Sequence, residues 1–324
     1  MLGSLNTAGE RLALDCSLSW LTELIIEGAA GELDRSTSLG GPIAIVVEAD
    51  RSAFEIDAWE PLTRGAWTRS QDVVVENVCT SGFDLLLRCT PERAEFTFRW
   101  RPPARDRALA RMLRSRFHLL ARAVLMQYPA LWWAGSRGRV PLHASACATG
   151  GSTPLLTAPS GIGRSTLLLA ELAAGGRATG DNLAVGDGAT VWGLVEPLRV
   201  EGGEGRRMPH GRQETPMPHR VRELVPDSLV VMRRGSEDAS TLALSCSEAA
   251  ARALVANTYM AGELRRYWAL AATLSAGSGL GPAHPSITEV AAAFATTRPC
   301  FTLTLGRRPG TSVSDLLSAM EDAA

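Results

Sequence analysis

The chain has 324 residues, of which 45% are hydrophobic and 21% are charged, a composition typical of a globular protein rather than a disordered one. Its 33 lysines and arginines almost balance its 34 aspartates and glutamates, so no global field favours nucleic acid or an anionic membrane as a partner. The six cysteines form no Cys-x-x-Cys pair, which indicates reduced thiols. Without a secretory signal or a run of about 18 apolar residues, we expect a cytoplasmic protein.

The N-terminal part of the chain contains four short β-rich runs separated by turn signals, at residues 41–50, 72–78, 83–89 and 94–100. We therefore expect a small α/β region over residues 1–129, whose role the sequence does not indicate.

A helical period begins at Arg107 and places apolar side chains between Leu109 and Val124 on one face. This pattern predicts a packed helix with a solvated arginine side. The alternative is that these arginines bind a membrane surface or a polyanion, although most such charge runs are simply solvated.

A strand, a glycine loop and a helix follow one another in the middle of the chain. Residues 140–148 and 153–158 are expected to form two strands, and the second runs directly into a glycine-rich loop. The apolar stretch 166–174 predicts a buried helix that Gly175 and Gly176 end. In a phosphate-binding loop, backbone amides and the positive end of the helix dipole meet the phosphates in this arrangement.

The loop sequence departs at two positions from the common pattern G-x-x-x-x-G-K-[ST]. Ala158 stands in place of the first glycine, and Arg164 stands in place of the lysine. A tight turn that binds nothing is the alternative to a phosphate site. The residues expected to bind a nucleotide are Ser160, Gly161, Ile162, Gly163, Arg164, Ser165 and Thr166.

The rest of the chain predicts further strands and helices. We expect a two-residue hairpin turn at Asp187-Gly188 and a strand pair at 229–234 and 240–245. Residues 247–272 are expected to form one or two helices, and 300–307 a final strand before a C-terminal helix. The stretch 201–222 is expected to be a mobile loop, which either folds over an acidic or phosphorylated substrate or is only solvated.

Residues 142–182, LHASACATGGSTPLLTAPSGIGRSTLLLAELAAGGRATGDN, resemble the catalytic core of HPr kinase/phosphorylase. They are most similar to the stand-alone HPr-kinase-like proteins, some of which accompany gene clusters for lasso peptides and other peptide natural products. In that family a histidine precedes the phosphate loop, and two aspartates follow the helix. Here His143, the loop at 158–165, and Asp181 followed by Asn182 stand in that order. The resemblance implies an α/β (α+β) P-loop kinase-like domain, related to phosphoenolpyruvate carboxykinase, over residues 130–324.

The resemblance also implies a role for each site residue. Asp181 would be the general base that accepts the proton of the attacking hydroxyl, and His143 would orient Asp181 or meet the γ-phosphate. Arg164 would stabilise the transferring phosphoryl group. Ser165 would hold Mg²⁺, and Asn182 stands at the second metal position. A turn aspartate and a core histidine are the structural alternatives for the first two.

We therefore expect a kinase that uses ATP, or another nucleoside triphosphate, with Mg²⁺ to phosphorylate a serine or threonine hydroxyl of a peptide or small protein. A second acidic metal ligand is expected at Glu196, Glu201 or Glu204. Arg164 and Asn182, which depart from the family pattern, favour instead a catalytically weak nucleotide-binding accessory protein. A small-metabolite kinase is a third alternative. No nucleic-acid or membrane partner is expected, and the sequence is compatible with a homo-oligomer.

Overall fold

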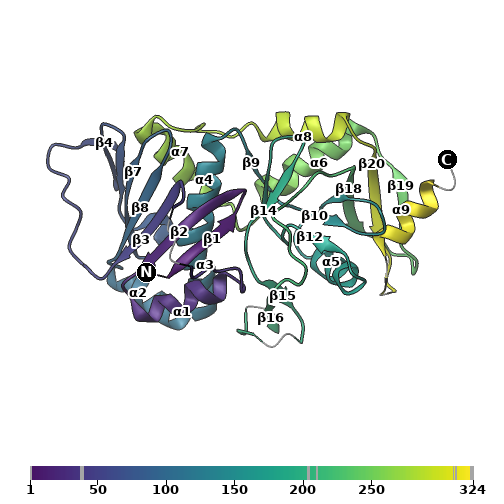
Figure 1. The fold of residues 1–324 in the computed structure, drawn as a ribbon, viewed down its shortest axis with the longest axis horizontal. Helices are drawn as coiled ribbons and strands as arrows, with labels where there is room; N and C mark the ends of the chain where they lie inside the picture. The colour runs from purple at the N-terminus through teal and green to yellow at the C-terminus, as the bar shows by residue number, and fades with distance from the viewer. Residues whose placement is uncertain are drawn as a thin grey trace. The chain divides into compact units, whose positions relative to one another are not determined.

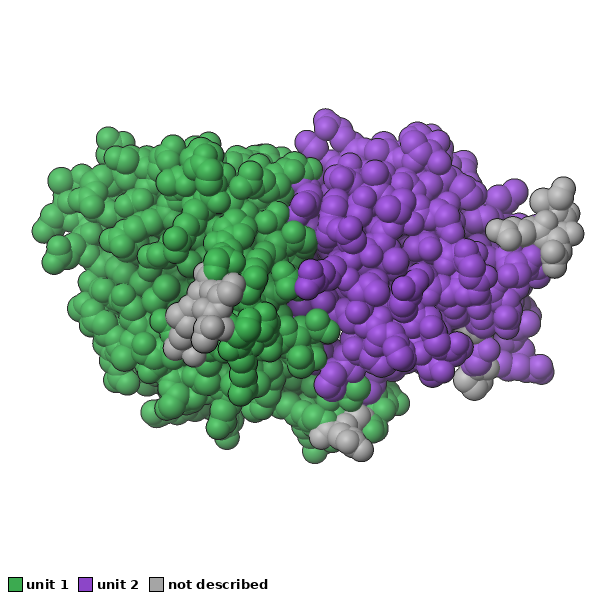
Figure 2. Space-filling view, in the orientation of Figure 1, with its two compact units in different colours: residues 1–138, 201–215, 266–285 green, residues 139–200, 216–265, 286–324 purple. Residues whose placement is uncertain are grey.

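The computed structural model describes residues 2–36, 40–202, 205–208, 211–308, 310 and 312–321. The chain forms two compact units with a mixed α/β architecture (Figure 2). Unit 1 comprises residues 1–138, 201–215 and 266–285, and unit 2 comprises residues 139–200, 216–265 and 286–324. The boundary expected at 129/130 thus lies within a helix of unit 1, and unit 1 also takes in two later stretches. None of the helices in the described ranges is long and apolar enough to cross a bilayer.

Unit 1 is built on an eight-stranded sheet in the order β1-β2-β3-β8-β7-β6-β5-β4 (Figure 1). β3 pairs in parallel with β2 and with β8, and the other neighbours are antiparallel. The strands of this unit are β1 (Gly3–Thr7), β2 (Glu10–Cys16), β3 (Ile43–Glu48), β4 (Glu60–Thr63), β5 (Ala66–Arg69), β6 (Asp72–Val75), β7 (Phe83–Cys89), β8 (Ala94–Trp100) and the short β16 (Gln213–Thr215).

The four strands predicted in the N-terminal part of the chain are confirmed as β3, β6, β7 and β8. In β3 the side chains of Ile43, Ile45 and Val47 alternate with less buried ones and are at most 1% exposed. This alternation is the pattern of a strand with one face against a core.

Helices α4 and α7 cover this sheet (Figure 1). α4 contacts β2 and β3, α7 contacts β4, β5 and β6, and the two helices also contact each other. Trp132 and Trp133 of α4 are buried. The helices of unit 1 are α1 (Ser19–Gly28), α2 (Ala104–Met112), α3 (Arg114–Arg122), a π-helical turn (Ala123–Gln127), α4 (Tyr128–Ser136), α7 (Tyr267–Ser278) and a 3₁₀ turn (Val78–Thr80).

The single packed helix predicted from Arg107 is wrong in its first part. The backbone leaves helical geometry at Leu113, with φ −112° and ψ 52°, so α2 and α3 are separate helices. Leu109 and Leu113 are 42% and 44% exposed, and α2 has no buried residue. The apolar face packs only from α3 onward, and α2 is largely exposed, with Asp106 accepting a hydrogen bond from Asn77.

Unit 2 contains a six-stranded sheet in the order β12-β10-β11-β18-β20-β19 and a four-stranded antiparallel sheet in the order β17-β14-β13-β9. Its strands are β9 (Val140–Leu142), β10 (Ala144–Ala148), β11 (Pro154–Thr157), β12 (Arg177–Ala178), β13 (Ala184–Gly186), β14 (Val191–Gly193), β15 (Leu198–Val200), β17 (Glu223–Leu224), β18 (Ser228–Arg234), β19 (Thr241–Leu244) and β20 (Cys300–Leu305). Its helices are α5 (Arg164–Ala173), α6 (Ser247–Met260), α8 (Ile287–Thr296) and α9 (Val313–Glu321).

The centre of the six-stranded sheet is parallel, because β18 pairs in parallel with both β11 and β20. Apolar side chains of these three strands form one core cluster with α5 and α9. α6 and α8 pack on the opposite face of the sheet (Figure 1). The carboxyl ends of the three parallel strands therefore lie at one edge, which is where open α/β sheets bind ligands.

Two local predictions in unit 2 need correction. The strands at 229–234 and 240–245 do not pair with each other, because β20 lies between β18 and β19. The hairpin between β13 and β14 has a longer turn than two residues, since Gly186 pairs with Val191. Asp187 stabilises this turn by accepting hydrogen bonds from the amides of Ala189 and Thr190.

The stretch 201–222, predicted as a mobile loop, has ordered contacts in its described part. Glu214 exchanges backbone hydrogen bonds with Gly205 and Arg206 as a small hairpin. The side chains of Glu214 and Arg206 also bind Arg122 and Glu27 of unit 1. These ion pairs connect the described part of the stretch to Arg122 and Glu27. Glu204 and His210 lie outside the described residues.

Candidate phosphate-binding site

The glycine loop joins the carboxyl end of β11 to the first turn of α5. Gly161 and Gly163 have φ values of +85° and +118°, in the left-handed region that favours glycine. A Cβ atom at Gly161 would meet no other atom within 4 Å, so the loop is open at that point. The loop therefore needs glycine at Gly161 and Gly163. Ala158, which stands at the first position of the pattern, is buried.

Backbone amides of the loop are free to bind a ligand. Within the described part of the chain, no amide of residues 160–166 donates a hydrogen bond to another protein group. These amides stand at the start of a ten-residue helix, where unpaired N–H groups and the helix dipole favour an anion. Ser160, Gly161 and Thr166 are exposed, whereas Ile162 packs partly against the core of the sheet.

Ser165 and Asp181 meet beside this loop. The hydroxyl of Ser165 donates a hydrogen bond of 2.8 Å to Oδ2 of Asp181. Asp181 is 1% exposed, and its other oxygen, Oδ1, is buried without a hydrogen-bond partner among the described residues. A buried carboxylate oxygen without a partner is costly, so it is a position where a cation or a proton donor would be stabilised.

Arg164 is bound within the protein. Its Nη1 donates to the carbonyl oxygen of His143 at 3.1 Å, and its Nη2 lies 3.1 Å from Nε2 of the same residue. Nη2 also lies 3.3 Å from Oδ1 of Asn182. Only 6% of Arg164 is exposed, and burial lowers its pKa. The guanidinium therefore holds His143 and Asn182 together, and its contact with phosphate stays a prediction.

His143 separates β9 from β10, and it is fixed by its backbone. Its amide donates to the hydroxyl of Thr258 and its carbonyl accepts from the hydroxyl of Thr157, both at 3.1 Å. Burial, and next the charge of Arg164, lower the pKa of the imidazole to about 4. The ring is therefore neutral at pH 7, and its Nε2 accepts from Arg164. This environment therefore does not favour a role for His143 as a proton carrier near neutral pH.

The sequence analysis missed the polar residues that support His143. Asn257 donates to the hydroxyl of Thr157 at 3.1 Å, and Thr258 is fully buried beside it. Both lie near the end of α6. An asparagine and a threonine at adjacent positions in an alanine-rich helix are a weak signal, because such residues also occur on exposed helix faces.

Of the three candidate acidic ligands, Glu196 is the one beside the site. Its Oε1 accepts hydrogen bonds from the amides of Asn182 and Leu183, at 3.0 and 3.3 Å, and its Oε2 accepts one from Arg199 at 3.2 Å. Burial is the main cause that raises its pKa. Because its oxygens already have partners, Glu196 supports the turn that carries Asp181. Glu201 is exposed in unit 1, and Glu204 lies outside the described residues.

The oxygen donors present fit a magnesium ion that is bound together with a nucleotide. No group of three or more His, Cys, Asp or Glu side chains that could hold a metal occurs in the described ranges. Mg²⁺ in phosphoryl-transfer sites is commonly held by one or two carboxylates together with substrate phosphates, so Ser165 and Asp181 are a suitable pair. Asn182 is less suited than the sequence predicted, because its side-chain oxygen already accepts a hydrogen bond from the Arg164 cation.

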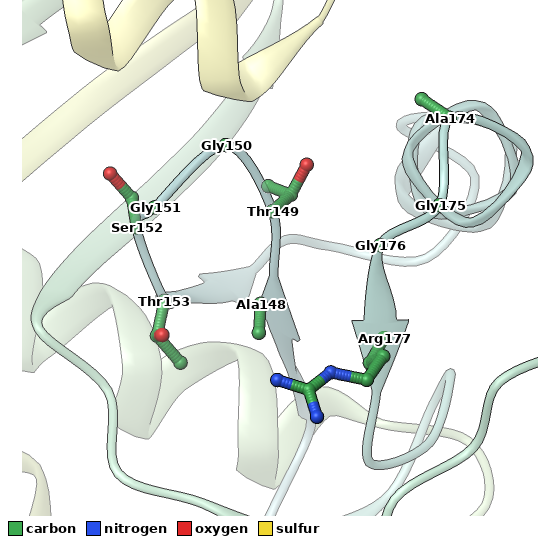
Figure 3. Close-up of a pocket in the computed structure, with 10 residues that line it drawn as sticks. All are labelled: Ala148, Thr149, Gly150, Gly151, Ser152, Thr153, Ala174, Gly175, Gly176 and Arg177. Atoms are coloured by element: carbon green, nitrogen blue, oxygen red, sulfur yellow. The ribbon is translucent and has the colours of Figure 1, made fainter.

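A separate cavity of about 360 Å³ lies at the other end of α5 (Figure 3). It is lined by the turn between β10 and β11, residues 148–153, and by residues 174–177, which follow the helix. Carbonyl groups at a helix carboxyl end disfavour anions. Because it lies at the opposite end of the helix, this cavity is not an extension of the glycine loop.

The described geometry brings together His143, Arg164, Ser165, Asp181 and Asn182, all from residues 142–182. Searches against models of protein families and against curated proteins find no match to this chain.

Proposed function

We propose that this protein is a kinase that uses ATP, or another nucleoside triphosphate, and Mg²⁺ to phosphorylate a serine or threonine hydroxyl on a peptide or small protein. The observation that carries the proposal is the hydrogen bond between Ser165 and Asp181 beside a glycine loop whose amides are unpaired in the described chain. The likeness of residues 142–182 to HPr kinase supports the same conclusion. Cytoplasm supplies the ATP that such an enzyme requires.

In the proposed reaction the substrate hydroxyl attacks the γ-phosphorus. A new O–P bond forms, the bond from the γ-phosphorus to the β–γ bridging oxygen breaks, and ADP leaves. Oδ1 of Asp181 accepts the proton of the hydroxyl, because it is the carboxylate oxygen that Ser165 does not occupy. The loop amides bind the phosphate oxygens as negative charge shifts among them. Ser165 and Oδ2 of Asp181 would hold the Mg²⁺, which neutralises phosphate charge when it is bound.

His143 and Arg164 act in this proposal as positioning residues. Arg164 bridges His143 and Asn182, and Asn182 is the neighbour of Asp181 in the chain. The cation therefore keeps the turn at 181–182 close to the helix start.

The bound state of Arg164 also favours a second candidate function, a nucleotide-binding accessory protein with weak transfer activity. In the common phosphate loop the lysine at this position reaches the β- and γ-phosphates. Here the corresponding guanidinium is committed to His143 and Asn182, so one contact that stabilises transfer has no counterpart at this position.

Incubation of the purified protein with γ-labelled ATP, Mg²⁺ and serine- and threonine-containing peptides tests the proposal. We expect labelled peptide, and we expect Asp181→Asn to lower its formation by about 10²–10⁴ while ATP binding persists. Asp238→Asn, a change at an exposed carboxylate, is the matched control and should have no effect.

The outcomes separate the candidates. ATP binding without any labelled product would favour the accessory protein, and label in a small metabolite instead of a peptide would favour a metabolite kinase. A melting temperature that millimolar ATP and Mg²⁺ do not change would exclude nucleotide binding, because a ligand selective for the native state must stabilise it.

A further inference from the structure

Arg234 lies against the glycine loop. It is the last residue of β18, and β18 pairs in parallel with β11, the strand that leads into the loop. The pairing of Thr157 with Val231 marks the end of β11, and β18 continues past this point to Arg234. A Cβ atom on Gly163 would lie 3.9 Å from Nη1 of Arg234, so the guanidinium lies beside the residue that precedes α5.

The charge of Arg234 is not neutralised within the described chain. The side chain is exposed, and among the described residues it makes no hydrogen bond or ion pair. Its neighbours at the same sheet edge differ in this respect. Arg233 donates to the hydroxyl of Thr304 at 2.9 Å, and Arg307 pairs with Asp238 at 3.1 Å.

A second observation indicates that this end of α5 binds a ligand. Asp181, 1% exposed and hydrogen-bonded to Ser165 in the first helical turn, keeps one buried oxygen without a partner in the described chain. A substrate hydroxyl beside the terminal phosphates would supply the proton donor that this oxygen lacks. The loop thus has unpaired amides, a buried carboxylate oxygen and an unpaired guanidinium on neighbouring elements.

We infer that Arg234 is the side-chain cation that binds the terminal phosphates of the nucleotide. Arg164 cannot make this contact without leaving His143 and Asn182, whereas Arg234 breaks no contact within the described chain. A guanidinium forks onto two phosphate oxygens, which suits it to the β- and γ-phosphates. The cation is thus supplied from the end of the neighbouring strand in place of the usual position in the loop. The inference rests on the proposed nucleotide binding at this loop.

Binding of ATP, AMP and inorganic tripolyphosphate to the wild type and to Arg234→Gln, measured calorimetrically with Mg²⁺, tests the inference. We expect Arg234→Gln to weaken ATP and tripolyphosphate by about tenfold to a hundredfold, because hydrogen bonds to a charged partner are lost. AMP, which lacks the terminal phosphates, should bind about equally to both proteins. Arg234→Lys should be intermediate, since it keeps the charge and loses the fork.

Arg233→Gln is the matched control, because it removes the same charge from the adjacent residue. Without nucleotide, both variants should melt within about 2 °C of the wild type, since both side chains are exposed. Equal losses of ATP and tripolyphosphate affinity in the two variants would show that only the general positive charge at the sheet edge matters. That result would overturn the inference. Wild-type binding that Arg234→Gln leaves intact would also overturn it, while nucleotide binding at the loop would stand. If the wild type binds neither ATP nor tripolyphosphate, the proposed function itself fails.

Discussion

Arg122 is a buried cation in unit 1 whose hydrogen bonds fix a distant part of the sequence. It donates to the carbonyl of Leu24, to Glu27 at 3.0 Å and to Glu214 at 2.6 Å. The side chains of Arg122 and Glu214 are 5% and 6% exposed. Two charges removed from water are stable only while they satisfy each other, so the loss of one partner should cost more than the loss of both.

We predict that Glu214→Leu lowers the free energy of unfolding by about 3 kcal/mol, because it leaves a buried guanidinium short of a partner. The double variant Arg122→Met/Glu214→Leu should recover most of this loss. Urea unfolding of the wild type, both single variants and the double variant gives the coupling energy. Strictly additive single effects would show that the two charges do not depend on each other.

At the candidate site, sequence analysis indicated which residues lie together but not how Arg164 is used. The order of His143, loop and Asp181 along the chain predicted their proximity, because the helix leads away from the carboxyl end of its strand and the segment after the helix returns to that sheet edge. The direction of a long side chain depends on neighbours that are remote in sequence. The position of Arg234 could not be predicted for the same reason, since the parallel pairing of β18 with β11 brings this residue to the loop.

Among the elements, α9 packs on the rest of unit 2 through apolar side chains and also contacts a buried carboxylate of α5. Glu171 is 2% exposed, and its Oε1 accepts a hydrogen bond of 2.6 Å from the amide of Val313, the first residue of α9. Its Oε2 accepts from the hydroxyls of Thr149 and Ser314, at 2.5 and 3.4 Å. A carboxylate at a helix N-terminus also interacts favourably with the helix dipole.

We predict that Glu171→Ala destabilises unit 2 by about 2–3 kcal/mol, because two hydroxyls and one amide lose a buried acceptor. Glu248→Ala is the control, since the Glu248 side chain is 77% exposed and pairs with Arg252 on the same helix. It should cost less than about 0.5 kcal/mol. Hydrogen exchange at the first turn of α9 reports the local effect. Unchanged protection there in Glu171→Ala would contradict the assigned contact.

Strands with a regular apolar pattern could be predicted from the sequence. The order in which strands pair within a sheet could not. β1 and β2 were missed because GSLNT and ERLALDC mix polar and apolar residues around a turn in which Ala8 adopts φ 53°. The insertion of β20 between β18 and β19 was missed for a different reason. Which strand lies beside which depends on crossover connections, and a local pattern carries no information about them.

At the scale of the whole molecule, two histidines with lowered pKa values, the buried His143 and the half-buried His118, should make the protein sensitive to mild acid. Burial lowers the pKa of His143 to about 4, with a further contribution from Arg164. Burial, and then Arg206 and Arg122, lower the pKa of His118 to about 4 as well. Between that value and about 6.5, the unfolded chain binds protons that the native state does not, so stability falls as pH falls.

We predict that the free energy of unfolding decreases between pH 6.5 and pH 5, by up to about 1.4 kcal/mol per pH unit for each histidine. Glu196 opposes this trend, since its raised pKa makes the native state bind a proton more readily as pH falls. Urea unfolding at several pH values measures the slope, and His118→Gln should flatten it. A stability that rises on acidification through this window would show that the histidines are not buried in the neutral form.

The interleaving of the two units along the chain has a consequence for synthesis on the ribosome. The strands β4, β5 and β6 are complete early, but α7, the helix that contacts them, comes almost two hundred residues later. At about 5–20 residues per second the nascent sheet waits roughly 10–40 s for that helix. During this interval its apolar face requires a chaperone or a temporary partner. A fragment that stops at residue 129 would keep this face uncovered permanently, so we expect such a fragment to aggregate, whereas a chain that reaches residue 285 can complete unit 1.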